Sequence, residues 1–153
     1  MSILQKLNLP QFELIIKEKE GKKYIFDSIR KNYFLLTPEE WVRQHFINFL
    51  ISTYNYPKQL IKIESGLRYN SMLKRSDILV YDREGEPFLL IECKSSDQKI
   101  NQAGFNQVSL YNMTIKAKYI ALSNGIKTYC CKINHENKSY EFVADIPKMP
   151  EQL

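Results

Sequence analysis

Asp77-Ile78-Leu79-Val80-Tyr81, followed after a polar connection by Phe88-Leu89-Leu90-Ile91-Glu92-Cys93-Lys94, is the stretch that decides the fold. Both runs are apolar and rich in β-branched and aromatic residues, which is typical of buried strands. The connection contains glycine and proline and predicts a reversal of the chain. A hairpin centred between Glu84 and Gly85 pairs position 77 with 92, 79 with 90 and 81 with 88.

This pairing brings two carboxylates to the open end of the hairpin. Side chains that face each other across antiparallel strands have Cβ atoms about 4.5–5.5 Å apart, so we expect Asp77 and Glu92 to be neighbours. Lys94 lies two residues beyond Glu92, on the same face. Charges in apolar strands are costly unless they are paired or bind a metal, and one hard cation could bridge both acids. Alternatively, the acids are strand-end carboxylates paired with Arg75 and Lys94, and a register slip of one residue would separate them.

The composition is that of an ordinary globular protein. Of 153 residues, 44% are hydrophobic and 25% are charged, which predicts a single domain, residues 1–153, with a core of its own. The net charge of +5 permits a polyanionic partner. Three cysteines and two histidines offer no spacing of a zinc site. Since neither a signal-peptide pattern nor an apolar run of membrane length is visible, we expect a cytoplasmic protein without a membrane partner.

The rest of the sequence predicts helices and strands around this hairpin. Thr37 and Pro38 suit the N-cap and first residue of a helix that runs to about Tyr54. A second helix is expected over about 98–116. Further strands are expected over 24–27, 33–36, 60–67, 119–123, 126–133 and 140–143, with a loop at 68–71. The central order of helix, three strands, helix and strand predicts a mixed sheet flanked by helices, with ancillary N-terminal strands at its edge and a C-terminal hairpin.

Four stretches carry a resemblance to a known family. They are Thr37-Pro38-Glu39-Glu40-Trp41-Val42-Arg43-Gln44, Arg75-Ser76-Asp77-Ile78-Leu79-Val80, Ile91-Glu92-Cys93-Lys94 and Gln107-Val108-Ser109-Leu110-Tyr111-Asn112. In this order they resemble the PD-(D/E)XK nuclease superfamily and, more closely, the nuclease domain at the N terminus of the motor subunit of type I restriction enzymes. The resemblance covers about residues 35–125 and implies an α/β, restriction-endonuclease-like fold with an αβββαβ core. Ser76 replaces the proline of the superfamily name, which is not a metal ligand.

The resemblance implies a metal-dependent endonuclease that hydrolyses phosphodiester bonds of DNA. Asp77, Glu92 and the backbone carbonyl of Cys93 would bind Mg²⁺, for which Mn²⁺ can substitute. Lys94 would orient the attacking water and offset the charge that develops on the phosphate. Gln107 would be a further site residue that touches the water or the DNA phosphate.

The first helix should add an acid to this site. Glu39 lies three residues before Val42 and seven before Phe46, on the apolar stripe, whereas Glu40 is rotated off that stripe. We therefore expect Glu39 to be the metal-binding acid. Both acids also suit a helix N terminus, where the macrodipole favours negative charge. Arg43, one turn further on, is expected to form an intrahelical salt bridge.

Several alternatives stay open. A noncatalytic nucleic-acid- or protein-binding module that retains the nuclease fold, as a subunit of a restriction complex, is the main alternative to an enzyme. The intact set of Asp77, Glu92 and Lys94 favours the enzyme, because a decayed site usually loses one of them. No P-loop motif occurs, so the chain holds no ATP motor of that type. DNA or RNA as substrate, a free-standing nuclease or a partner of other restriction subunits, and a monomer or a homodimer are all compatible with the sequence.

Overall fold

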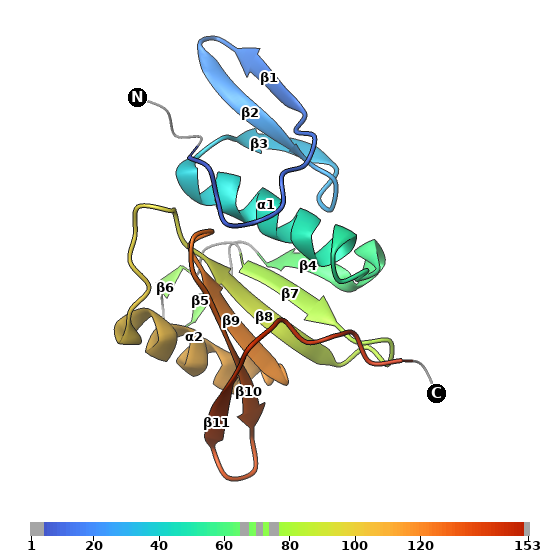
Figure 1. Ribbon diagram of the computed structural model, residues 1–153, viewed down its shortest axis with the longest axis vertical. Helices are drawn as coiled ribbons and strands as arrows, with labels where there is room; N and C mark the ends of the chain where they lie inside the picture. The colour runs from blue at the N-terminus through green and yellow to red at the C-terminus, as the bar shows by residue number, and fades with distance from the viewer. Residues whose placement is uncertain (1–4, 65–67, 70–71, 74–76, 152–153) are drawn as a thin grey trace.

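The computed structural model describes the backbone of residues 5–64, 68–69, 72–73 and 77–151, and the side chains of all of these except 64, 68, 69, 72, 73 and 77. The elements are arranged around one mixed sheet (Figure 1). In chain order they are β1 (Ile16–Lys19), β2 (Lys22–Asp27), β3 (Asn32–Leu35), α1 (Pro38–Ser52), η1 (Lys58–Leu60), β4 (Ile61–Glu64), β5 (Arg68–Tyr69), β6 (Met72–Leu73), β7 (Asp77–Tyr81), β8 (Pro87–Cys93), α2 (Gln102–Ile115), β9 (Tyr119–Ser123), β10 (Thr128–Asn134) and β11 (Ser139–Val143).

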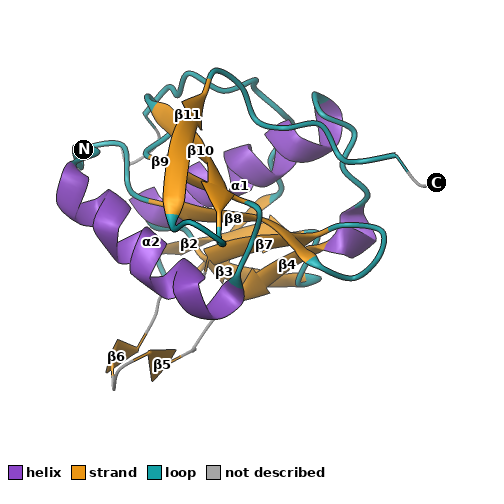
Figure 2. Ribbon diagram, turned by 90° about the horizontal axis from the view of Figure 1, so that it is seen from below, coloured by secondary structure: helices purple, strands orange, loops and turns teal. Residues whose placement is uncertain are grey.

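The central sheet has six strands in the order β11-β10-β9-β8-β7-β4. β4, β7 and β8 form an antiparallel meander, and β9 lies parallel to β8, which it follows through the crossover helix α2. β10 and β11 continue the sheet as antiparallel strands. Figure 2 shows α1 and α2 on opposite faces of this sheet. The predicted α/β class and the meander followed by a crossover are therefore confirmed, in an arrangement compatible with a restriction-endonuclease-like fold.

The register of the β7–β8 hairpin agrees with the sequence at one end and differs at the other. Leu79 pairs with Leu90, as predicted, whereas Tyr81 pairs with Pro87 and the ladder shifts between Val80 and Tyr81. The predicted pairing of 81 with 88 is wrong. A bulge of this kind takes up one extra residue without disturbing the ladder beyond it.

The turn after β7 explains the shift. The carboxylate of Asp82 is 4% exposed and accepts the backbone N–H groups of Glu84 and Glu86, at 2.9 and 3.0 Å. The Asp82 N–H in turn donates to the carbonyl of Glu86 at 2.8 Å. Gly85 has a φ of +83°, which glycine adopts at no steric cost. These hydrogen bonds close the turn between Asp82 and Glu86. As a result, Tyr81 pairs with Pro87 rather than with Phe88.

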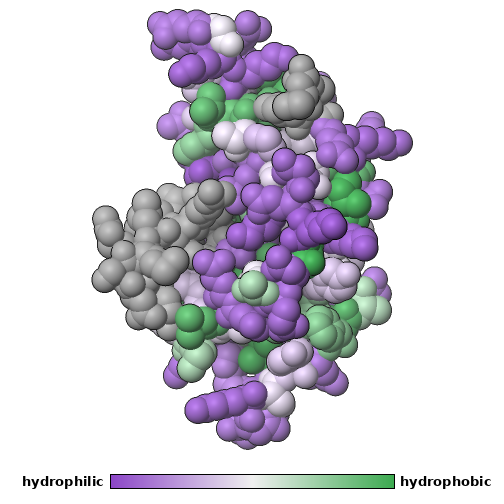
Figure 3. Space-filling view, turned by 90° about the vertical axis from the view of Figure 1, so that its left-hand side faces the viewer, coloured by the Kyte–Doolittle hydropathy of each residue, from purple (hydrophilic) through white to green (hydrophobic). Residues whose placement is uncertain are grey.

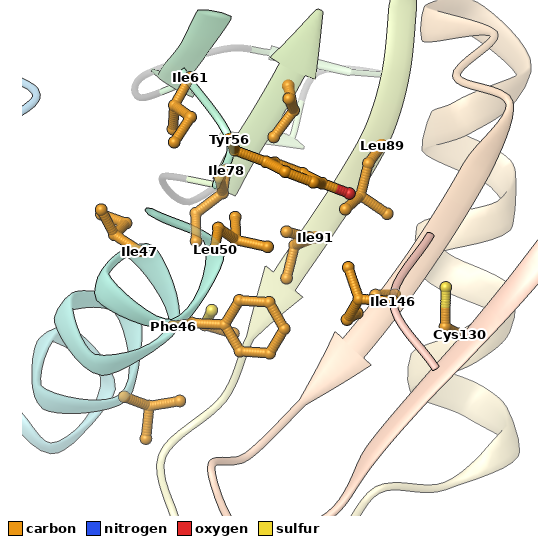
Figure 4. Packing of buried hydrophobic residues seen from close by; sticks show 14 of the residues in the cluster. Phe46, Ile47, Leu50, Tyr56, Ile61, Ile78, Leu89, Ile91, Cys130 and Ile146 are labelled. Atoms are coloured by element: carbon orange, nitrogen blue, oxygen red, sulfur yellow. The ribbon is translucent and has the colours of Figure 1, made fainter. Parts of the chain in front are cut away.

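Alternation along β7 and β8 separates two apolar clusters. Ile78 and Ile91 face α1, while Leu79 and Leu90 face α2. Figure 4 shows side chains of α1 directed at the first cluster, among them Phe46, which is fully buried. Burial of a side chain of this size contributes about 1.5–3 kcal/mol to the free energy of unfolding. The two faces account for the near-continuous apolar composition of these strands.

The cysteines follow the same alternation. Cys130 belongs to the cluster on the α1 side and Cys131 to the cluster on the α2 side. Both are free thiols, because neighbours on a strand point to opposite faces and are poorly placed to form a disulfide.

The N-terminal strands differ from the prediction. β1, β2 and β3 form an antiparallel sheet of their own rather than the edge of the central sheet. β1 was not predicted, because all four side chains of Ile16–Lys19 are exposed and the strand shows no apolar alternation. The pair β5 and β6 likewise replaces the loop expected at 68–71.

Both helices begin at side-chain caps. The Thr37 hydroxyl accepts the N–H of Glu40 at 3.0 Å, as the sequence predicts for this N-cap. α2 begins at Gln102, later than expected, because the Asn101 side chain accepts the N–H of Gly104 at 2.9 Å and caps it there. Neither this helix nor any other among the described residues has the length and apolar character to span a membrane.

Candidate active site

The C-terminal end of β8 holds a carboxylate and a lysine side by side. Glu92 is 4% exposed, and its Oε2 lies 3.6 Å from Nζ of Lys94. Cys93, between them, is 1% exposed and packs into the core on the α1 side. The predicted alternation is confirmed: Glu92 and Lys94 share one face of the strand, and Cys93 occupies the other.

The backbone of this segment is fixed by β9. Glu92 pairs with Leu122 and Cys93 with Ser123. The N–H of Lys94 donates to the carbonyl of Ser123 at 2.8 Å, one residue beyond the end of β8. The backbone of Lys94 is therefore held in place by β9. Its side chain is partly accessible to solvent, with 23% of its surface exposed.

Asp77 is the first residue of β7, and its backbone pairs with that of Glu64 in β4. The side chains of both residues lie outside the described ones, as do Arg75 and Ser76 altogether. The β7–β8 ladder is described as far as the pair Ile78–Ile91, whose next neighbours in sequence are Asp77 and Glu92. That the two carboxylates face each other stays a prediction, which this register favours.

The first turn of α1 corrects the expectation for its two acids. Glu40 is 6% exposed and accepts hydrogen bonds from Arg43 Nη1, Arg30 Nη2 and Gln44 Nε2, at 2.8, 2.9 and 2.9 Å. Glu39 is less buried, with 19% of its side chain exposed, and lies 3.8 Å from Nη2 of Arg43. Glu40 was expected to point away from the buried face, and that is wrong. The expected intrahelical salt bridge of Arg43 is confirmed.

The burial of Glu40 follows from the turn between β2 and β3. Asp27, fully buried, accepts Nε of Arg30 at 2.7 Å and Nε2 of Gln44 at 2.9 Å, as well as the backbone N–H of Arg30 at 3.0 Å. The guanidinium of Arg30 also lies over the ring of Phe34, at 3.5 Å. Two arginines and two carboxylates thus balance each other at the start of α1. Sequence reasoning missed this network, although the spacings of Asp27 to Arg30 and of Glu40 to Arg43 are both i to i+3.

These contacts shift the protonation of Asp27. Burial alone raises the pKa of its carboxyl, but the hydrogen bonds from the Arg30 backbone, Gln44 and the Arg30 guanidinium outweigh it, so the pKa is lowered. Asp27 is therefore an acceptor-only carboxylate at neutral pH, which suits a structural ion cluster.

The start of α1 and the end of β8 lie on the same side of the molecule (Figure 1). Gln5 connects the two: its carbonyl accepts Nε1 of Trp41 at 2.8 Å, and its side-chain oxygen accepts the hydroxyl of Ser96 at 2.8 Å. α1 itself packs on the sheet face that carries Cys93, whereas Glu92 is on the α2 face. Glu39 and Glu92 therefore start from opposite faces of the sheet, and their carboxylates could meet only around its end.

Gln107 is exposed on α2, whereas Tyr111, one turn later, is 4% exposed and packs into the α2-side cluster. This burial gives Tyr111 a structural role in the packing of α2 on the sheet. The role of Gln107 stays a prediction. Figure 3 shows that the side of the molecule carrying the starts of both helices is predominantly hydrophilic, with apolar residues in small separate patches.

The donors at this end of the sheet suit a hard cation. The carboxylate of Glu92 and the carbonyl of Cys93 are oxygen ligands, which Mg²⁺ prefers over nitrogen and sulfur. Among the described side chains, no three of His, Cys, Asp and Glu converge as a metal-binding group. Mg²⁺ usually keeps several waters and binds through one or two carboxylates plus phosphate oxygens. The carboxylate of Glu92 and the carbonyl of Cys93 are donors of the kind that such a site uses.

A comparison with known families relates the chain to restriction enzymes. Residues 38–147, more than half of the chain, match the family model described as type I restriction enzyme R protein N terminus (HSDR_N). The matched range includes the first turn of α1, the β7–β8 hairpin and α2. No curated protein matches the chain.

Proposed function

This chain belongs to the family of type I restriction enzyme R protein N termini, and from that membership we propose that it is a metal-dependent endonuclease that hydrolyses phosphodiester bonds of DNA. The membership relates the chain to restriction systems. The nuclease activity, the metal and the DNA substrate are the proposal.

The observation that carries the proposal is the buried Glu92 carboxylate with Lys94 Nζ at 3.6 Å on the same strand face. Glu92, Asp77 and the Cys93 carbonyl would hold Mg²⁺. When bound there, the ion would polarise the phosphate and lower the pKa of water. Lys94 would donate from its ammonium to a nonbridging phosphate oxygen and offset negative charge in the transition state.

Two further residues have roles in the proposal. Gln107 is exposed on α2 and can donate its amide to a phosphate oxygen or to the attacking water. Glu39 extends the acid set from the first turn of α1, with Arg43 as its ion-pair partner at 3.8 Å. Glu40 is excluded from this set, because its carboxylate is committed to Arg30, Arg43 and Gln44.

The test is cleavage of supercoiled plasmid and of single-stranded DNA with Mg²⁺ or Mn²⁺. We expect metal-dependent cutting by the wild type and a loss of about 100-fold or more in Glu92→Gln and in Lys94→Ala. The matched controls are Glu84→Gln and Lys132→Ala, which change exposed residues of the same types away from the end of β8. Equal losses in the controls would contradict the assignment of the site.

Thermal stability separates the enzyme from a binding module that retains the fold. A ligand that binds only the folded state raises the melting temperature, so Mg²⁺ should stabilise the wild type and not Asp77→Asn or Glu92→Gln. A folded wild type that neither cuts DNA nor gains stability from Mg²⁺ would overturn the proposal in favour of the binding module. Metal binding without cleavage would contradict a free-standing nuclease and favour a subunit of a larger complex.

A further inference from the structure

A basic groove lies along β4, the last strand of the central sheet. Its volume is about 670 Å³, and its walls are residues 28–31 of the β2–β3 turn and residues 58, 59 and 61–63 of η1 and β4. Among the described residues of the lining are four cationic side chains and no carboxylate: Arg30, Lys31, Lys58 and Lys62.

The four cations are not equivalent. Arg30 is held by Asp27 at 2.7 Å and by Glu40 at 2.9 Å, so it forms part of the wall. Lys31, Lys58 and Lys62 are exposed, and none of them pairs with a carboxylate among the described side chains. The groove therefore presents three solvated positive charges beside an apolar floor that includes Ile61.

The register of the sheet relates the groove to the candidate active site. Lys62 pairs with Leu79, and Leu79 pairs with Leu90. Paired residues share a face, so the side chain of Lys62 is on the face of Leu90 and Glu92, whereas those of Ile61 and Ile63 pack on the α1 side. The groove therefore lies at the edge of the sheet, and Lys62 is its member on the Glu92 face. Two strand spacings of about 4.8 Å and two residues of about 3.3 Å put the Cα atoms of Lys62 and Glu92 about 12 Å apart. At about 3.4 Å of rise per nucleotide, this is a span of three to four nucleotides.

We propose that this groove binds the phosphate backbone of the DNA that the β8 site cleaves, with Lys31, Lys58 and Lys62 as the phosphate contacts. The choice of DNA rests on the proposed function. A nucleic acid fits because its charges repeat along a chain that can reach from the groove to Glu92. Lysine ammonium groups neutralise such phosphates as point charges and release condensed counterions.

The experiment measures binding of a fluorescent duplex oligonucleotide by anisotropy, in EDTA and from about 50 to 200 mM salt. The test variant is K31E/K58E/K62E. We expect it to weaken binding by about tenfold or more and to make the slope of log K against log salt shallower by about 0.9 for each phosphate contact removed. The matched control is K132E/K138E/K148E, with the same net charge on exposed lysines elsewhere. Lys138 matches Lys31 in backbone too, with φ of 57° and 55°.

If the test and control variants lose affinity for DNA equally, the groove is not the binding site, and the net charge of the protein alone accounts for the loss. Tighter binding of a polyglutamate peptide than of DNA, lost in K31E/K58E/K62E, would overturn the choice of nucleic acid in favour of an acidic protein. Circular dichroism and the melting temperature check that both triple variants are folded.

Because the assay needs no turnover, it is separate from the proposed activity. Glu92→Gln should lose cleavage and keep its affinity for DNA. If the wild type binds DNA through the groove but does not cut it, the proposed nuclease activity is wrong and the proposed DNA-binding role of the groove is supported. If the wild type cuts DNA but K31E/K58E/K62E binds DNA as tightly as K132E/K138E/K148E, only the proposed role of the groove is wrong.

Discussion

Nζ of Lys94 lies 3.6 Å from Oε2 of Glu92, and the residue between them is buried on the opposite face of the strand. The core therefore holds Cys93 while the acid and the ammonium emerge together from the other face. The Lys94 N–H donates a hydrogen bond to the carbonyl of Ser123 at 2.8 Å. The sheet, rather than a loop, therefore positions Glu92 and Lys94.

Lys94→Arg should separate catalysis from charge. Arginine keeps the positive charge beside Glu92, but its planar fork places the donors differently from an ammonium. We expect the free energy of unfolding to change by less than about 1 kcal/mol, while cleavage falls by about 100-fold or more. Denaturant titration and single-turnover cleavage measure the two quantities. Wild-type cleavage by Lys94→Arg would show that only the charge matters.

Changing Glu40 to glutamine should mainly lower the stability of the protein, whereas changing Glu39 to glutamine should mainly lower its cleavage activity. Glu40 is 6% exposed and bonded to two arginines, so E40Q should cost about 2–4 kcal/mol of stability. Glu39 is 3.8 Å from one arginine and more exposed, so E39Q should cost less than about 0.5 kcal/mol. If Glu39 binds the metal, E39Q should nevertheless lose cleavage and need more Mg²⁺. Unchanged cleavage in folded E39Q would remove Glu39 from the site.

Acid should weaken the protein in a way that depends on Asp27. The folded-state pKa of this carboxyl lies below its ordinary value. Its stabilising contribution is therefore fully present above the ordinary pKa of about 3.9 and is lost as the pH falls through the folded-state value. Asp27→Asn should cost about 3–5 kcal/mol at pH 7, and this cost should shrink as the pH falls below about 4. The exposed Asp145→Asn is the control, and urea titrations across this pH range are the measurement.

Two glycines with the same backbone angle should respond differently to alanine. Gly85 and Gly125 have φ of +83° and +84°, so alanine strains both by about 1–2 kcal/mol. A Cβ at Gly125 would also lie 2.8 Å from Cδ2 of buried Leu7, whereas one at Gly85 meets no atom within 4 Å. G125A should therefore be less stable than G85A by about 1 kcal/mol or more. Equal melting temperatures would mean that Leu7 does not pack there in solution.

The hairpin at the centre of the fold was predictable because its information is local. Alternation of side chains along β7 and β8 fixes which residues face α1 and which face α2, and the pair of Leu79 and Leu90 follows from it. The bulge at Tyr81 was not predictable from the same pattern, because it depends on how the Asp82 carboxylate bonds to the backbone of its own turn.

The positions of Glu39 and Glu40 show a different limit. A stripe of apolar residues predicts the buried face of a helix, but it ignores polar groups that another element buries. Arg30 reaches Glu40 from a turn ten residues earlier in the sequence, and only the packing of β2 and β3 against α1 reveals this contact. The candidate site was predicted as a motif, and its face and order along β8 followed from strand geometry.

The burial of all three thiols has a practical consequence. Cys93, Cys130 and Cys131 are at most 4% exposed, and burial raises the pKa of Cys130 to about 12 and of Cys131 to about 11. Thiolates are the form that maleimides attack, so the native cysteines should stay unlabelled in the folded protein at neutral pH. A single cysteine introduced at exposed Gln59, in the wall of the groove, would then carry a fluorophore in an otherwise unaltered sequence. The native chain is thus already a background for site-specific spectroscopy.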